Sequence, residues 1–86
     1  MKESYITKDF RKTAAERFPE RASVLNAAFD RRLEALRAEN AGATKQKQRH
    51  LESQILPGIA AYETLQQVMP KNEALQTIHG YVEQRA

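Results

Sequence analysis

The sequence contains no cysteine, and proline and glycine each occur only three times. The lack of cysteine excludes disulfides, thiolate nucleophiles and cysteine-ligated metals, and it fits a cytoplasmic protein. No apolar run approaches the roughly 18 residues that a membrane span requires. The first ten residues, MKESYITKDF, also lack the apolar core of a signal peptide. We therefore expect a cytoplasmic location and no membrane association.

The chain also has only a small excess of charge of either sign. The net charge of +3 and the sequence pI of about 9.5 reflect a mild basic excess that is spread along the chain. Nucleic-acid-binding proteins usually carry a concentrated basic patch, so we predict that nucleic acid is an unlikely partner. One short segment could bind an anion or an acidic partner, although a solvated helix start is the simpler interpretation. Its candidate residues are Lys45, Lys47, Arg49 and His50.

What the sequence does have is helical periodicity. Apolar residues recur at steps of three and four in four segments, at about 1–18, 19–40, 45–68 and 71–84. Short connections make successive helices antiparallel. We therefore predict a single all-α domain, residues 1–86, built as a small antiparallel bundle of about four helices. The apolar stripes of the first, second and fourth segments are Ile6, Phe10, Ala14 and Phe18; Ala22, Leu25, Phe29, Leu33 and Leu36; and Ala74, Leu75, Ile78 and Val82.

The segment 50–69 has the strongest pattern, and we expect it to form the central helix and an interface. Leu56 and Ala60 widen its apolar stripe, so more than one neighbour could cover it. Pro57 lacks a backbone N–H and its ring crowds the carbonyl of Ser53, which predicts a kink or break there. The expected main stripe is Leu51, Ile55, Ile59, Tyr62, Leu65 and Met69.

No catalytic, metal-binding or cofactor-binding pattern is recognisable. The glycines are isolated, so there is no glycine-rich phosphate loop, and the two histidines have no ligand spacing. We predict no cofactor and no metal, and we assign no catalytic residue.

The central segment continues into a short break and an acidic-Ala-Leu helix start. In the order of these residue types along the chain, positions 50–84 resemble the helical segment of the bacterial L-2-amino-thiazoline-4-carboxylic acid hydrolase family. Members of that family open a thiazoline ring hydrolytically, and they have a further region after the helices. The resemblance therefore implies a scaffold of a larger architecture, truncated here or excised as its N-terminal helical part. The matching residues are Leu51, Ile55, Leu56, Pro57, Gly58, Ile59, Ala60, Tyr62, Leu65, Glu73, Ala74 and Leu75.

Three hypotheses about function follow. The first is a non-catalytic helical module that acts through self-association or a helical protein partner. A domain of this size buries only about 60% of the surface of its unfolded chain, which favours a homodimer built on the third helix. The second is part of a hydrolase that opens a cyclic amidine or amide together with the further region. The third is a weak binder of nucleic acid or an acidic partner.

Overall fold

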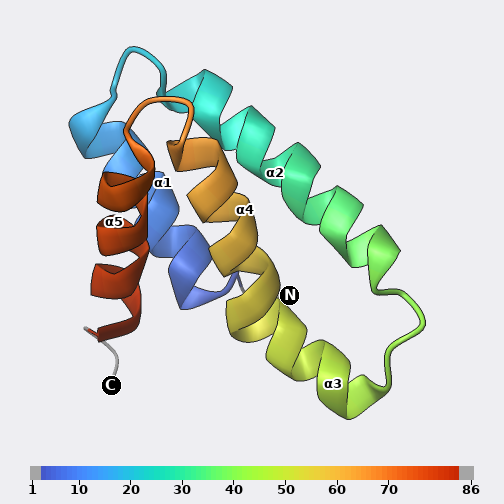
Figure 1. Ribbon diagram of the computed structural model, residues 1–86. Coiled ribbons are helices and arrows are strands. Elements are labelled where there is room, and N and C mark those ends of the chain that lie inside the picture. The colour runs from blue at the N-terminus through green and yellow to red at the C-terminus, as the bar shows by residue number, and fades with distance from the viewer. Residues whose placement is uncertain (1–2, 84–86) are drawn as a thin grey trace.

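The computed structural model describes residues 3–83, and all regular structure within that range is helical (Figure 1). The helices form four rods, and successive rods run in opposite directions. The third rod consists of three pieces that follow one another without a gap. The predicted all-α bundle of about four helices is therefore confirmed, whereas the predicted helix limits at residues 1 and 84 lie outside the described range. The elements are α1 (Tyr5–Arg17), α2 (Ala22–Glu39), α3 (Lys45–His50), a π-helical turn (Leu51–Ile55), α4 (Leu56–Leu65) and α5 (Lys71–Glu83).

Side-chain caps fix the starts of α1 and α3. The Ser4 hydroxyl accepts a hydrogen bond from the backbone N–H of Thr7 at 3.2 Å, and Thr44 caps α3 in the same way through Lys47 N–H at 3.3 Å. Each cap satisfies one of the N–H groups that have no partner within the helix. The second helix begins at Ala22, three residues later than predicted, because residues 18–21 form a turn first.

The core is centred on two phenylalanines. Phe10 of α1 and Phe29 of α2 are fully buried, and their ring centroids lie 4.5 Å apart at an angle of 48°. The central element is α4, which contacts α1, α2 and α5. The predicted stripes of the first two helices are confirmed for their central residues, since Ile6 and Leu33, for example, are also buried. Phe18, which follows the end of α1, and Ala22 are only partly buried against this core. The other buried apolar residues are Ala14, Leu25, Leu36, Leu51, Leu56, Ala60, Ala61, Leu65, Met69, Ala74 and Tyr81.

The third rod stays helical through Pro57. In the π-turn, the backbone N–H of Leu56 donates to the carbonyl of Leu51, five residues earlier. A π-turn widens the helix just where the proline ring would otherwise crowd the Ser53 carbonyl. The predicted break therefore does not occur, and a kink at Pro57 is not confirmed.

The same turn corrects the predicted stripe. Because it inserts an extra residue, the buried face passes from Leu51 to Leu56 rather than to Ile55. Leu56, Pro57 and Ala60 are buried together with Leu65, so the side that was predicted to be secondary is the core side. Ile55 and Ile59 remain 39% and 38% exposed, and the prediction that they share one face with Leu51 and Leu65 is wrong.

The central aromatic contact gives a test of the core. Truncating Phe29 to alanine leaves a cavity beside Phe10, so we expect the free energy of unfolding to fall by about 3–5 kcal/mol. Urea unfolding followed by circular dichroism measures this change. Val24→Ala on the same helix, where the side chain is 64% exposed, should change the value by less than about 0.5 kcal/mol. Equal effects of the two substitutions would contradict the assigned core.

Candidate functional site

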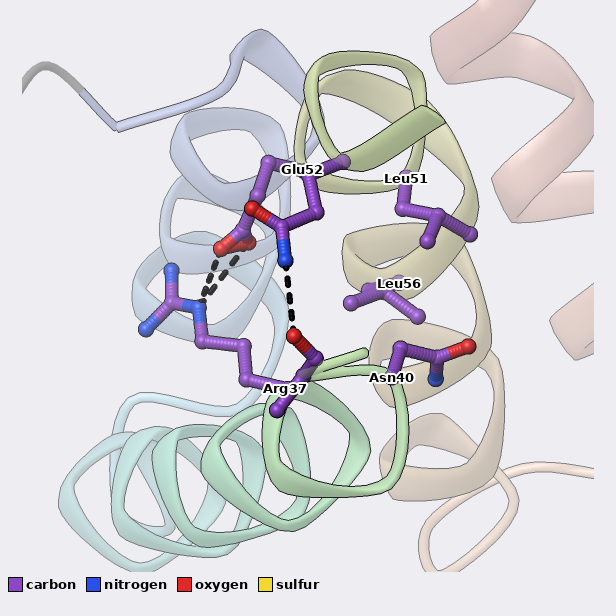
Figure 2. Close-up of a pocket in the computed structure, with 7 residues that line it drawn as sticks. Arg37, Asn40, Leu51, Glu52 and Leu56 are labelled. Carbon is purple, nitrogen blue, oxygen red and sulfur yellow. Dashed lines mark hydrogen bonds and ion pairs between the residues drawn. The ribbon is translucent and has the colours of Figure 1, made fainter. Parts of the chain in front are cut away.

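A small hollow lies between the end of α2 and the π-turn (Figure 2). Its volume is about 260 Å³, and Leu51 and Leu56 form its apolar wall. The Nε2 of Gln48, another lining residue, donates to the carbonyl of Ala41 at 3.1 Å. The guanidinium of Arg37 pairs with Glu52 across the hollow. The polar groups on its rim are therefore largely bonded to one another.

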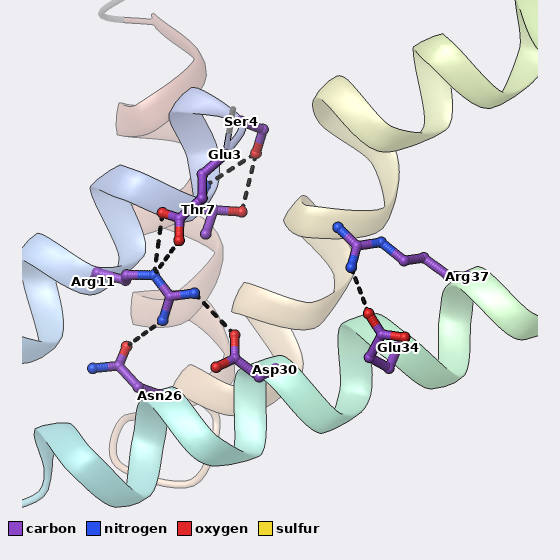
Figure 3. A network of polar contacts seen from close by, with 8 residues as sticks. All are labelled: Glu3, Ser4, Thr7, Arg11, Asn26, Asp30, Glu34 and Arg37. Atoms are coloured by element: carbon purple, nitrogen blue, oxygen red, sulfur yellow. Dashed lines mark hydrogen bonds and ion pairs between the residues drawn. The ribbon is translucent and has the colours of Figure 1, made fainter. Parts of the chain in front are cut away.

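A second hollow of about 220 Å³ adjoins the first, because Arg37 and Glu52 line both. It lies where the start of α1, the middle of α2 and the π-turn meet. Arg11 lies on its rim and donates to the carboxylates of Glu3 and Asp30, at 3.2 and 3.0 Å (Figure 3).

These ion pairs hold both arginines charged. Partial burial acts to lower the pKa of Arg11, but the hydrogen bonds to Glu3 and Asp30 outweigh it and the net pKa is raised. In the same way, partial burial acts to lower the pKa of Arg37, but its hydrogen bonds to Glu34 and Glu52 outweigh burial and the net pKa is raised. Neither guanidinium is available as a free anion site, since its charge is already neutralised. Half-exposed ion pairs on the rims of the two hollows thus connect α1, α2 and the π-turn. Each pair contributes about 0–1 kcal/mol to stability.

The predicted anion-binding residues do not converge. Lys45, Lys47, Arg49 and His50 all lie exposed on α3, and none forms an ion pair with a described residue. Helical geometry places Lys45 and Arg49 on one side and Lys47 and His50 on another. Within residues 3–83, no cluster of three or more histidine, cysteine, aspartate or glutamate side chains could hold a metal ion.

Contacts with α1 determine how α5 is oriented. The Tyr81 hydroxyl is hydrogen-bonded to Thr13, and Glu73 accepts from Arg17 at 2.8 Å, so this flank of α5 faces α1. The opposite flank carries Leu75 and Val82, which are 46% and 43% exposed. Ala74 and Tyr81 are the buried apolar residues of the helix, which corrects the prediction that Leu75 and Val82 belong to the core stripe.

Apolar surface is therefore left exposed on two helices that contact each other. In the described part of the chain, α5 contacts α1 and α4 (Figure 1). Tyr62 of α4 and Ile78 of α5 are partly buried against the core, whereas Ile55, Ile59, Leu75 and Val82 are exposed. We call this surface the α4–α5 apolar face. It consists of Ile55, Ile59, Tyr62, Leu75, Ile78 and Val82.

Charge is depleted on this face. The ten residues from Ser53 to Tyr62 include no charged side chain. Glu63 is the one charged residue of α4, and it pairs with Arg32 of α2. On α5, His79 lines a shallow hollow with three apolar neighbours and lies 3.5 Å from the carboxylate of Glu83. Protein interfaces share this property, since charged residues are depleted at their centres.

Sequence periodicity identified the residue types of this face but not its position. Five of the thirteen residues of α5 are apolar and spread over two sides, so no single stripe identifies the buried side. One sequence signal could have indicated an exposed apolar face: α4 and α5 contain more apolar residues than a single neighbouring helix can cover. None of the helices in the described part of the chain is long and apolar enough to span a membrane.

Comparison with protein-family models, curated proteins and solved structures finds no match to this chain. The resemblance to the thiazoline-carboxylate hydrolases is thus neither supported nor contradicted, and it stays a prediction. Of the residues that carry it, Leu56 and Ala60 lie in the core, whereas Ile55, Ile59 and Leu75 lie exposed on the apolar face.

The contact between α1 and α5 predicts a dependence on pH. Burial raises the pKa of the Tyr81 phenol above its usual value of 10.0, although the hydrogen bond with Thr13 opposes this shift. A pKa raised in the folded state means that the associated stability is fully present below pH 10 and is lost as pH rises through the folded pKa. We expect absorbance titration at 295 nm to show a phenol with an upshifted pKa. Tyr81→Phe should remove that phenol and reduce the loss of stability above pH 10. An unchanged titration curve in the variant would contradict the assignment.

Proposed function

We propose that this chain is a helical association module that self-associates through the α4–α5 apolar face and does not act as a catalyst by itself. The observation that carries the proposal is where exposed apolar side chains lie. Among described residues, the large hydrophobic side chains that are more than a third exposed are Val24, Ile55, Ile59, Leu75 and Val82. Four of these five belong to one face, whereas scattered single residues would be ordinary for a monomer.

The size of the chain supports a second copy as the partner. A stable interface buries about 800 Å² on each partner, roughly one seventh of the 5880 Å² accessible surface of this chain. The α4 residues alone are too few for that area, but α4 and α5 together offer two apolar stripes. Covering apolar surface contributes about 25 cal/mol per Å². A two-fold contact covers the same face on both copies at once and is the commonest arrangement of homodimers.

The charge of the face supports the same partner. Packing the uncharged stretch from Ser53 to Tyr62 of one copy against that of another removes no ion from water, so this part of the contact has no charge-desolvation penalty. An acidic or basic partner would find no complementary charge between Ser53 and Tyr62. The face is therefore best matched by another apolar helical surface, and the chain itself carries one.

A pair of substitutions tests the proposal. Ile59→Asp places a charge on the face at a side chain that the fold leaves 38% exposed. Val24→Asp places the same charge on an exposed apolar residue outside the face. Light scattering or sedimentation at several concentrations should give about twice 9.8 kDa for the wild type and for Val24→Asp, and 9.8 kDa for Ile59→Asp. Circular dichroism should show that both variants remain helical.

A wild-type mass of 9.8 kDa at every concentration would contradict the proposal. Dissociation by Val24→Asp to the same extent as by Ile59→Asp would assign the contact to a different surface.

The hydrolase hypothesis makes a separate prediction for the same chain. The charged side chains that line the two hollows are engaged with one another, as Arg37 is with Glu34 and Glu52. We therefore expect the pure protein to leave 2-amino-thiazoline-4-carboxylate unchanged, as measured by chromatography of this substrate and of N-carbamoyl-cysteine, the product toward which the hydrolase family opens the ring. Ring opening faster than in buffer alone would overturn the view that the module is non-catalytic by itself.

A further inference from the structure

The glycine at position 58 has no role that its own chain explains. It lies inside α4, where glycine disfavours the helix relative to alanine. Its φ is not positive, and among the described residues a Cβ built on it would have no atom within 4 Å apart from its chain neighbours and the backbone of its own helix. Neither backbone conformation nor packing in this part of the chain therefore requires glycine here.

Its neighbours are the residues of the apolar face that lie at the end of the π-turn and on α4. Ile55, Ile59 and Tyr62 stand three before, one after and four after Gly58, so they surround it on the helix surface. A missing side chain among larger apolar ones allows a second helix to approach closely, with the larger residues packing to either side. The uncharged sequence around it removes no ion from water in such an approach.

We propose that a second copy of this chain crosses its α4 over the first at Gly58, with the two-fold axis passing beside this residue. At such an axis each residue meets its own counterpart, which makes it the point of closest approach in an antiparallel crossing. Ile55 of each copy then lies beside Tyr62 of the other, and the α5 residues Leu75 and Val82 complete the contact at its edges. This inference rests on the proposed self-association and adds its partner geometry.

A second helix-interior glycine provides a matched control. Gly80 of α5 also has no positive φ, and a Cβ built on it would likewise meet no described atom within 4 Å beyond its chain neighbours and its own helix backbone. It lies on the α1 side of its helix, beside Thr13 and Tyr81 and away from the apolar face. Alanine at either position should favour the helix, whereas only position 58 should affect association.

The first experiment compares Gly58→Ala with Gly80→Ala by sedimentation. The added methyl group at the crossing overpacks the contact, so we expect Gly58→Ala to raise the dimer dissociation constant about tenfold. Gly80→Ala should leave it unchanged. Thermal unfolding under monomeric conditions should show both variants at least as stable as the wild type. Unchanged or tighter association of Gly58→Ala would overturn the proposed crossing.

The second experiment uses the absence of cysteine. A disulfide requires Cα atoms about 4.4–6.8 Å apart, so Gly58→Cys should form a cross-linked dimer under mild oxidation faster than Gly80→Cys. Equal rates, with a wild type that is dimeric by light scattering, would overturn the crossing at Gly58 and leave the proposed function intact. A monomeric wild type would overturn the proposed function as well.

Discussion

The packing of α4 against three other helices is the constraint on which the rest of the structure depends. Ala60 and Ala61 are fully buried, and their small side chains allow neighbouring backbones to come close. The phenylalanine pair of α1 and α2 belongs to the same buried cluster. Because three sides of α4 are covered by the chain, one side is left for water or for a partner, and the exposed isoleucines lie on that side.

The π-turn before α4 determines which side this is. It moves the buried face from Leu51 to Leu56, a step of five that no regular α-helix makes between residues of one face. Without the extra residue, the face that continues from Leu51 would include Ile55. The π-turn therefore directs the larger β-branched residues outward and the smaller alanines inward. Pro57, two residues after the end of the turn, restricts where such an irregularity can lie.

Much of the fold could be predicted from the sequence because α1 and α2 each bury a single stripe. Phe10 and Phe29 recur in stripes with steps of three and four, and both are in the core. The buried sides of α4 and α5 could not be predicted in this way, because their apolar residues lie on more than one side of each helix. Which of these residues are buried depends on where the neighbouring helices pack. The π-turn could not be predicted from the spacing of apolar residues, because that analysis assumes a constant number of residues per helical turn.

The polar contacts could not be predicted in the same way. Arg37 is one of several charged residues on α2, and nothing in its local sequence distinguishes Glu52 as a partner fifteen residues later. Such pairs depend on how two helices approach each other in space. The cap residues Ser4 and Thr44 are the exception, because their partners lie three residues away in sequence.

The attachment of α5 has a consequence for cooperativity. Ala74 and Tyr81 are the buried residues of this helix, and in the described part of the chain it contacts α1 and α4 alone. Helices with few buried side chains open locally at lower free energy than the core, and their amide hydrogens exchange sooner. The most protected unit of the domain is then α1, α2 and α4. A partner that covers Leu75 and Val82 also holds α5 in place, so association and the local folding of this helix become one coupled equilibrium.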